Sequence, residues 1–452
     1  MQPAKSKAGY GMTLSACLWL GLFPLLQGGT YAHITYDKWI LMLVLSGITG
    51  LCFLFDLIAA RRFSKARPGE KFSVRTVLPL VLAAALLLWT VLSCLVSSFG
   101  PDTWFRGAAV RYEGLISQLC YFFLFACFFF SRVRLKPVLL SAAAGLLVFF
   151  VIVLLQRAGG NPLGLYPGGR SYVQNPEFQG TIGNIDMGTG YLLLLAGLFL
   201  HGFFSVIPDL KHYRSAKTDA GDRKFPLLSC LFSGVLLLAL LITLWLIITM
   251  DVQFGVISLS VLVLVTFFRY LPKKTRLLVF ILLVVIVLLA VWFWPGHSGG
   301  LWELHEVLHG RTQLSFGSNR LAVWYYSLLL SRENLLTGGG SGTFRTRFNE
   351  FLMKNDLKIP TEQDGRALPD YFDTPHNEYI AQLTDHGLPA LILFILLLLL
   401  AVFRKRDRLL PLLTPCSAAV LCYAVQAFFA FSVCIVAPMF WILLALSFKE
   451  QV

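Results

Sequence analysis

Charged residues are scarce in this sequence. Asp, Glu, Lys and Arg together make up 14% of its 452 residues, while 57% are hydrophobic. A soluble domain usually carries about 25% charged and about 45–50% apolar residues. A chain of this composition could not cover its surface with polar groups. The scarcity of charge therefore excludes a soluble globular protein and predicts a polytopic membrane protein.

Several motifs of other protein classes are also absent. The nine cysteines lie in apolar runs and form no CxxC pair, so they indicate small buried hydrophobic residues and not disulfides or metal ligands. No Asp-x-Asp metal motif occurs, and no internal repeat or Pro- or Ser-rich linker divides the chain. We therefore expect one membrane domain that works without a metal or another cofactor.

What the sequence does contain is a series of long apolar segments. A transmembrane helix needs about 20 predominantly apolar residues. Only a short polar break separates the seventh candidate from the eighth. A cleaved signal peptide is the alternative for the first, but the many later spans favour an uncleaved helix. The twelve candidate segments are 11–27, 39–60, 76–98, 114–131, 137–155, 187–206, 226–249, 253–268, 277–294, 379–403, 409–430 and 433–448.

Lys and Arg residues determine the predicted orientation, because they are enriched in short cytoplasmic loops. With both termini in the cytoplasm, 25 of the 38 Lys and Arg residues fall in cytoplasmic segments and 13 in outer ones. The net charge of +14 then reflects this bias and not nucleic-acid binding. We expect an all-α, multi-pass protein of the plasma membrane in three parts. They are an N-terminal bundle of about nine spans (1–294), a large helical extracytoplasmic loop (295–377) and about three C-terminal spans (378–452).

Orientation alone does not explain the arginines close to span ends on the outer side. Arg106 and Arg111 precede one span, and Arg170 lies in the outer loop before another. They are either interfacial anchors, with Trp104 and Tyr112 as belt aromatics, or phosphate ligands. A guanidinium suits a phosphate because it can donate two parallel hydrogen bonds.

Two further segments have both a structural and a functional interpretation. The stretch 180–186, with Asn184, is either a helix cap or an anion site at a helix N-terminus. In the large loop, Arg320 and Trp324 are four residues apart and share a helix face, as in a stacked surface pair. The Gly-rich segment 336–344 suits a tight turn or a close approach to a ligand. It lacks the Lys-Ser/Thr ending and the preceding strand of a P-loop.

The segment His305-Glu306-Val307-Leu308-His309 matches the HExxH pattern of zinc peptidases. Zinc would need a third ligand, for which Glu333 is available. This short pattern recurs by chance, so a zinc peptidase is the weakest alternative.

His376 lies at the lip of the span predicted at 379–403. A lone interfacial histidine is usually a snorkelling polar residue. Here Pro375 fixes its approach to the helix, and Asp373 is close enough in sequence to orient the imidazole. The surplus arginines lie on the same predicted side of the membrane, which favours a functional histidine.

Taken in chain order, these segments resemble the O-antigen ligase and O-antigen polymerase superfamily over residues 100–450. "GSNRLAVW" and "LLTGGGSGTF" are similar to its Arg-x-x-x-Trp and Gly-rich segments, and "PHNEYIAQLTDHGLPALILF" to its His-Asn motif. "GTIGNIDMGTGYL" and "FRGAAVRYEGL" resemble earlier family segments. One feature departs from the family, because the place of its Ser-Arg pair reads Thr249–Gln253 here, without arginine.

The resemblance implies a GT-C-like glycosyltransferase with about 12 transmembrane helices. Such an enzyme moves a glycan from a polyprenyl diphosphate to a glycan, lipid or protein acceptor on the outer face. By position His376 would be the base and Arg320 would bind the diphosphate, with Arg111, Arg106 or Arg170 as the second cation. The supporting residues would be Asn377, Asp373, Trp324 and Asn184.

This chemistry agrees with the residue types. An imidazole can take the proton of a weakly nucleophilic sugar hydroxyl near neutral pH, and fixed arginines stabilise the charge of the departing diphosphate. A lipid-linked glycan transporter is the other alternative, but it would more naturally place charges along a path inside the spans.

Overall fold

The computed structural model describes residues 9–63, 74–108, 111–216, 227–359, 372–403 and 413–449, and these are mostly helical. The α-helices are α1 (Tyr10–Cys17), α2 (Ile34–Phe63), α3 (Val74–Leu95), α4 (Pro101–Trp104), α5 (Leu115–Phe130), α6 (Leu135–Arg157), α7 (Ile185–Ala216), α8 (Leu227–Thr249), α9 (Gln253–Tyr270), α10 (Lys273–Trp292), α11 (Gly300–Leu308), α12 (Arg320–Ser331), α13 (Phe344–Lys354), α14 (Glu378–Phe403), α15 (Pro415–Gln426) and α16 (Ala437–Ser447). Shorter helical turns are η1 (Leu18–Leu22), η2 (Tyr31–His33), η3 (Pro167–Gly169) and η4 (Arg332–Asn334), and the strands β1 (Phe178–Gln179) and β2 (Gly183–Asn184) pair antiparallel.

Each of the twelve predicted segments coincides with an apolar helix, which confirms an all-α membrane protein. Seven helices in the described ranges are long and apolar enough to cross a membrane: Tyr31–Ala60, Val77–Leu95, Leu135–Arg157, Ile185–Val206, Leu227–Thr249, Lys274–Trp292 and Glu378–Phe403. The other five predicted segments contain shorter apolar helices: Tyr10–Leu22, Leu115–Phe130, Gln253–Arg269, Pro415–Gln426 and Ala437–Ser447. Twelve crossings and the GT-C-like class stay predictions. The basic stretches 64–73, 217–226 and 404–408, and the start of the span 409–430, lie outside the described residues.

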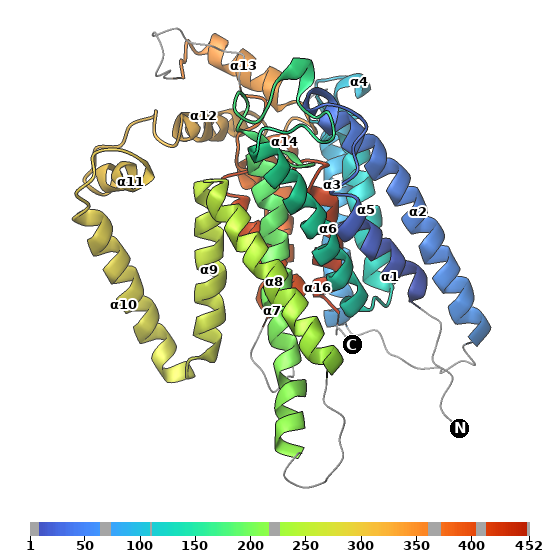
Figure 1. Ribbon diagram of the computed structural model, residues 1–452. Coiled ribbons are helices and arrows are strands. Elements are labelled where there is room, and N and C mark those ends of the chain that lie inside the picture. The colour runs from blue at the N-terminus through green and yellow to red at the C-terminus, as the bar shows by residue number, and fades with distance from the viewer. Residues whose placement is uncertain are drawn as a thin grey trace.

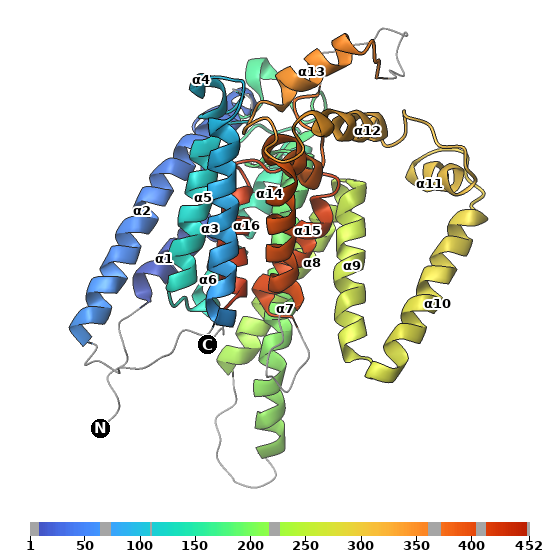
Figure 2. The same cartoon turned by 180° about the vertical axis from the view of Figure 1, so that it is seen from behind.

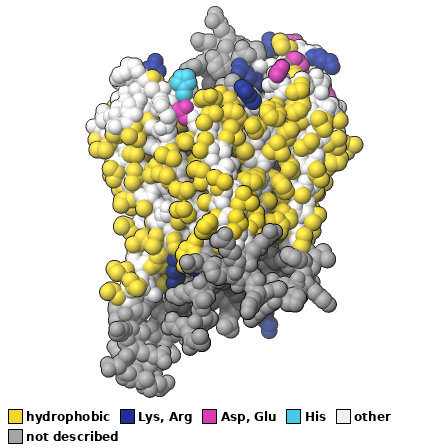
Figure 3. Space-filling view, turned by 90° about the vertical axis from the view of Figure 1, so that its right-hand side faces the viewer, with side chains coloured by type: hydrophobic (Ala, Val, Ile, Leu, Met, Phe, Trp, Pro, Cys, Tyr) yellow, Lys and Arg dark blue, Asp and Glu magenta, His cyan; other side chains and the backbone are white. Residues whose placement is uncertain are grey.

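The centre of the helix bundle is formed by α7, α15 and α16. Every residue of α16 is buried, and α7 packs along α15 over much of its length. A Cβ atom on Gly197 would lie 2.4 Å from the backbone nitrogen of Ala419, so glycine permits this close helix contact. The other apolar helices surround this core, and a broad hydrophobic band covers the bundle surface between the charged groups at its two ends (Figures 1 and 3).

Helix α10 stands apart from the bundle and contacts α11 (Figures 1 and 2). Its side chains are apolar and mostly exposed, as expected for a helix that faces lipid. The chain then returns to the bundle through α11, which lies beside the end of α10, and through α12 and α13, which lie above one end of the bundle.

The predicted large loop is helical and has a small core of its own. Apolar residues of α12 and α13 pack together, with Phe344 and Phe348 stacked at a centroid distance of 4.9 Å. The members of this core are Ala322, Val323, Tyr326, Leu330, Phe344, Phe348, Leu352 and Ile359. This packing gives the loop a fixed shape above the membrane-spanning helices.

The Gly-rich segment fits against a break in α14. At Gly387 the backbone adopts φ 83° and ψ 176°, a conformation almost exclusive to glycine. The backbone amides of Gly339 and Gly340 donate to the carbonyl oxygens of Thr384 and Asp385 beside this break, at 3.1 and 2.8 Å. The glycines therefore allow two segments of the protein backbone to approach each other closely. The sequence had suggested either a tight turn or a close approach to a ligand.

The faces of the membrane can be tested by cysteine labelling. We expect Val173→Cys, in the exposed loop between α6 and α7, to react with a membrane-impermeant maleimide on intact cells. Thr275→Cys, in the first turn of α10, should react only after permeabilisation, because the start of α10 belongs to a Lys- and Arg-rich segment that we predict to be cytoplasmic. The unsubstituted protein is the control for its own cysteines, and the reverse labelling pattern would contradict the orientation.

Candidate active site

His376 lies in the short segment that leads into α14. Its Nδ1 atom is 3.1 Å from the carbonyl oxygen of Thr374. Because a carbonyl oxygen only accepts hydrogen bonds, Nδ1 carries the proton and Nε2 keeps its lone pair. The rings of Phe431 and Phe372 meet the imidazole edge-on, at centroid distances of 5.0 and 6.1 Å. The ring is thus oriented with one nitrogen able to accept a proton.

Neighbouring contacts hold this segment in an unusual conformation. His376 has φ +50°, a left-handed value that costs about 1–2 kcal/mol outside glycine. The indole nitrogen of Trp324 donates to the carbonyl of Pro375 at 3.0 Å. The side-chain oxygen of Asn377 accepts from the amide of Ile380 at 3.1 Å and caps the start of α14. Trp324 and Asn377 therefore position the histidine.

Arg111 and Asp373 form a two-pronged ion pair beside the histidine. The Nε and Nη2 atoms of Arg111 lie 2.6 and 3.1 Å from the two carboxylate oxygens of Asp373. The same guanidinium lies 4.2 Å from the centre of the Phe431 ring, which also contacts His376. Asp373 thus binds Arg111, while the backbone of Thr374 orients the imidazole.

Arg320 and Asp186 begin two helices that meet at the site. Arg320 is the first residue of α12, and its Nη2 atom is 3.9 Å from an oxygen of Asp186 in the first turn of α7. Asn184 accepts a hydrogen bond from the amide of Asp186 at 2.8 Å. Asn184 is therefore a local helix cap. Arg320 is partly exposed, and its guanidinium has hydrogen-bond donors available for a ligand.

The charges around His376 determine its protonation. Burial, followed by the positive charge of Arg320 and the weaker effect of Arg111, lowers the pKa of His376 to about 4 against the opposing effects of Thr374 and Asp373. A lowered histidine pKa means that the neutral form prevails above that pH. His376 is therefore a neutral imidazole at pH 7, as a base requires.

The four arginines predicted as diphosphate ligands fall into two groups. Arg111 and Arg320 lie near enough to His376 and Asp186 for their positive charges to affect the ionisation of both side chains. The guanidinium groups of Arg106 and Arg170 are exposed, and neither forms an ion pair or hydrogen bond within the described part of the chain. The sequence missed Arg157, which donates to the carbonyl of Thr249 at 3.3 Å, beside the segment that lacks the family's arginine.

A cavity with about 640 Å³ of empty space opens beside the Arg111–Asp373 pair. Its lining includes the acidic side chains of Glu113, Glu378 and Asp385. Tyr121 donates to Glu113 at 2.6 Å, and burial raises the pKa of Glu113 to about 8. The other lining residues are Ala108, Arg111, Gln118, Gly342, Phe344, Asp373, Thr374, Pro375, Ala381, Gln382, His386, Phe431 and Ser432.

Several of these polar residues could not be identified as site residues from the sequence alone. Asp385 pairs with Arg347 of α13 at 3.0 Å. His386 lies 2.8 Å from the hydroxyl of Ser341 and 3.0 Å from the side-chain oxygen of Gln382. The one available signal was the polar run at the start of the predicted span 379–403, since charged groups within spans usually face a protein interior.

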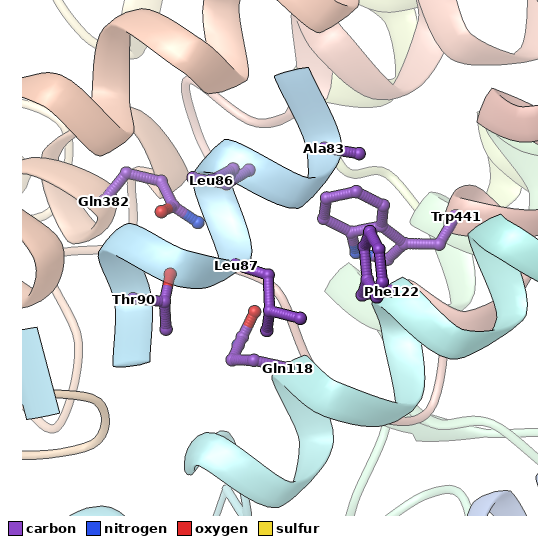
Figure 4. A pocket seen from close by; sticks show the side chains of 8 residues that line it. All are labelled: Ala83, Leu86, Leu87, Thr90, Gln118, Phe122, Gln382 and Trp441. Carbon is purple, nitrogen blue, oxygen red and sulfur yellow. The ribbon is translucent and has the colours of Figure 1, made fainter. Parts of the chain in front are cut away.

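A smaller cavity of about 310 Å³ lies between α3, α5, α14 and α16 and shares Gln118 and Gln382 with the larger one. In Figure 4, polar side chains are gathered on one side of it and the rings of Phe122 and Trp441 on the other. Ala83, Leu86, Leu87 and Thr90 complete its wall. Its lining carries no charge, so it offers nothing to hold a diphosphate.

The HExxH segment forms α11 but has the geometry of a structural helix. Both carboxylate oxygens of Glu306 accept hydrogen bonds from Arg311 at 2.6 Å. The residue that would act as the base of a zinc peptidase is therefore occupied by an ion pair. The ring centroids of His305 and His309 are 4.1 Å apart, and the rings are tilted by 39°. No group of three metal-ligating side chains occurs among the residues that the structure describes, so these histidines lack a third ligand there.

Comparison with known protein families gives a match. The family described as O-Antigen ligase matches residues 237–395, which run from α8 into α14 and include both Arg320 and His376. None of the curated proteins compared with the chain matches it.

The charges around His376 predict a measurable change in its pKa. In the unsubstituted protein we expect His376 to titrate well below 6.5, and Arg320→Ala should raise that pKa because it removes a nearby positive charge. NMR titration of histidine-labelled protein, assigned with His376→Gln, measures both values. Arg332→Ala, in the exposed turn η4, is the matched control and should leave the titration unchanged. An ordinary pKa for His376 in the unsubstituted protein would contradict the site's electrostatics.

Proposed function

Because the O-antigen ligase family matches residues 237–395 of this chain, we propose that it is an integral-membrane glycosyltransferase of the cell envelope. It would transfer a glycan from a polyprenyl diphosphate to an acceptor hydroxyl on the outer face of the plasma membrane, with both termini in the cytoplasm. The observation that carries this proposal is the position of His376 near Arg320 and Arg111, with Nε2 able to accept a proton.

In the proposed reaction, Nε2 of His376 takes the proton of the acceptor hydroxyl as its oxygen attacks the anomeric carbon of the donor sugar. The bond between that carbon and the phosphate oxygen breaks, and the diphosphate leaves with its electron pair. Arg320 and Arg111 stabilise the negative charge that grows on the leaving group. The free hydrogen-bond donors of Arg320 suit this role, because a guanidinium matches a phosphate with two parallel bonds.

Donor binding would also activate the base. Burial lowers the pKa of His376 most, and the two arginines lower it further. A bound diphosphate offsets their positive charge, so the pKa of His376 should rise towards its ordinary value. A base is most effective when its pKa lies near the working pH. His376 would therefore become a stronger base once the donor is in place.

The acceptor distinguishes the two activities of the superfamily. A polymerase would join lipid-linked repeat units to one another, and a ligase would move a finished chain to a lipid, protein or other acceptor. Lipid-linked glycans in cells without the protein separate these cases. Accumulated short units indicate a polymerase, and finished chains left on the lipid carrier indicate a ligase.

Removal of the proposed base should abolish transfer. We expect His376→Ala to lower glycan transfer by about 100-fold or more, since general base catalysis contributes about that much. The assay follows glycan release from lipid-linked donor in membranes that contain equal amounts of inserted protein. His297→Ala is the matched control, because His297 is exposed and lies outside the site. Normal transfer by His376→Ala would remove the catalytic role.

Removal of the diphosphate ligands should affect donor use. We expect Arg320→Ala and Arg111→Ala to lower kcat/KM for the lipid-linked donor by about 100-fold, as for other lost transition-state donors. Arg320→Lys should recover only part of this loss, because lysine cannot form two parallel bonds. Arg106→Ala and Arg170→Ala are the matched comparisons and should have small effects. Thermal stability measured in parallel separates these losses from unfolding, and equal effects at all four arginines would contradict the assignment.

A further inference from the structure

The large cavity beside His376 has a charge that selects its ligand. We propose that this cavity holds the acceptor sugar, that it accepts uncharged or amino-bearing sugars, and that it rejects acidic ones. The inference rests on the proposed function in naming the ligand an acceptor, but the sugar selectivity follows from the lining of the cavity itself.

The charge of the lining is unbalanced. Two of its four carboxylates are paired, Asp373 with Arg111 and Asp385 with Arg347. Glu113 and Glu378 have no Lys or Arg at ion-pair distance among the described residues, and both are hydrogen-bonded by tyrosines, Tyr121 and Tyr423. Above the raised pKa of Glu113, an anionic ligand would meet ionised carboxyl groups that have no cation at ion-pair distance to offset the repulsion, because Arg111 is already paired with Asp373. A hydroxyl or an ammonium group would meet acceptors.

The remaining side chains suit a sugar. Gln118 and Gln382 can both donate and accept hydrogen bonds, and Gln118 approaches Glu113 at 3.4 Å. Phe344 and Phe431 add apolar faces against which the carbon-bound hydrogens of a sugar ring can pack. A concave site with aromatic walls and a few fixed polar groups is typical of small-ligand binding. Hydroxyl groups lined up with these carboxyls and amides would orient the acceptor.

The cavity and the proposed diphosphate-binding residue Arg320 lie next to different neighbours of His376. Phe431 lines the cavity and contacts the imidazole edge-on. Arg320 and Asp186 do not line the cavity. The acceptor would therefore come past Phe431, while the diphosphate would be held at Arg320. Separate positions for the two substrates keep the negative charge of the donor away from the acidic lining.

Binding of three disaccharides to the protein in nanodiscs tests the inference. The probes are N,N′-diacetylchitobiose, which is uncharged, the dimer of glucosamine, which carries amino groups, and digalacturonic acid, which is acidic. Saturation-transfer NMR titrations give their dissociation constants. In titrations at about pH 9, above the raised pKa of Glu113, we expect the acid to bind at least about ten-fold more weakly than the other two, because like charges in a buried site repel. Equal binding of all three would overturn the inference.

Substitutions then locate the selectivity. Glu113→Gln and Glu378→Gln keep the shape but remove the charge, and each should reduce the preference for the glucosamine dimer over digalacturonic acid several-fold. Glu350→Gln, on the exposed face of α13, is the matched control and should leave the preference unchanged. Unaltered preference in both cavity variants would also overturn the inference. If neither variant folds, the comparison of the three probes on the unsubstituted protein still decides it.

Failure of this inference differs from failure of the proposed function. If His376→Ala abolishes transfer but acidic sugars bind as well as the others, only the selectivity of the cavity is wrong. If sugar binding follows the two glutamates but transfer does not need His376, the catalytic proposal is wrong and the sugar cavity stands.

Discussion

The contact between the Gly-rich segment and the broken start of α14 determines the geometry of the site. A break in a membrane helix leaves carbonyl groups without their usual partners, and in the bilayer these must be satisfied by protein. Here Gly339 and Gly340 donate to the carbonyls of Thr384 and Asp385, and Trp89 donates to that of His386 at 3.0 Å. In the other direction, the backbone amide of Leu388 donates to the carbonyl oxygen of Leu335 at 2.8 Å. The large loop is thereby joined to α14 at its break.

Several close approaches make this contact possible only with glycine. A Cβ atom on Gly387 would lie 2.0 Å from the carbonyl oxygen of Leu336, and one on Gly338 would lie 2.4 Å from the carbonyl carbon of Asp385. Arg347 adds a charged link, because it donates to the carbonyl of Thr384 at 2.8 Å and pairs with Asp385. As a result α12, which carries Arg320, and the segment that carries His376 are held against one rigid element.

Around His376 the protein separates two kinds of charge. Burial lowers the pKa of His376 and keeps it neutral, and the positive charges of Arg320 and Arg111 add to this effect, whereas the carboxyl groups of Glu113 and Glu378 line the adjoining cavity. Burial makes both effects stronger than they would be in water. In our proposal the anionic leaving group and the hydroxyl nucleophile meet at the imidazole from these two differently charged regions.

The sequence by itself determined the class of protein and the helices. The low charge and the apolar runs predicted all twelve helical segments, because helix formation in a bilayer depends on local composition. The resemblance of short motifs to a known family identified His376 and Arg320 as candidate site residues, and the region that the family matches contains both. Tertiary structure decided the rest. It placed Arg111 near His376 and left Arg106 and Arg170 exposed, paired Asp373 with Arg111, and gathered Glu113, Glu378 and Asp385 around one cavity. These groups lie on segments far apart in the chain, and their positions depend on how the helices pack, which no local pattern records.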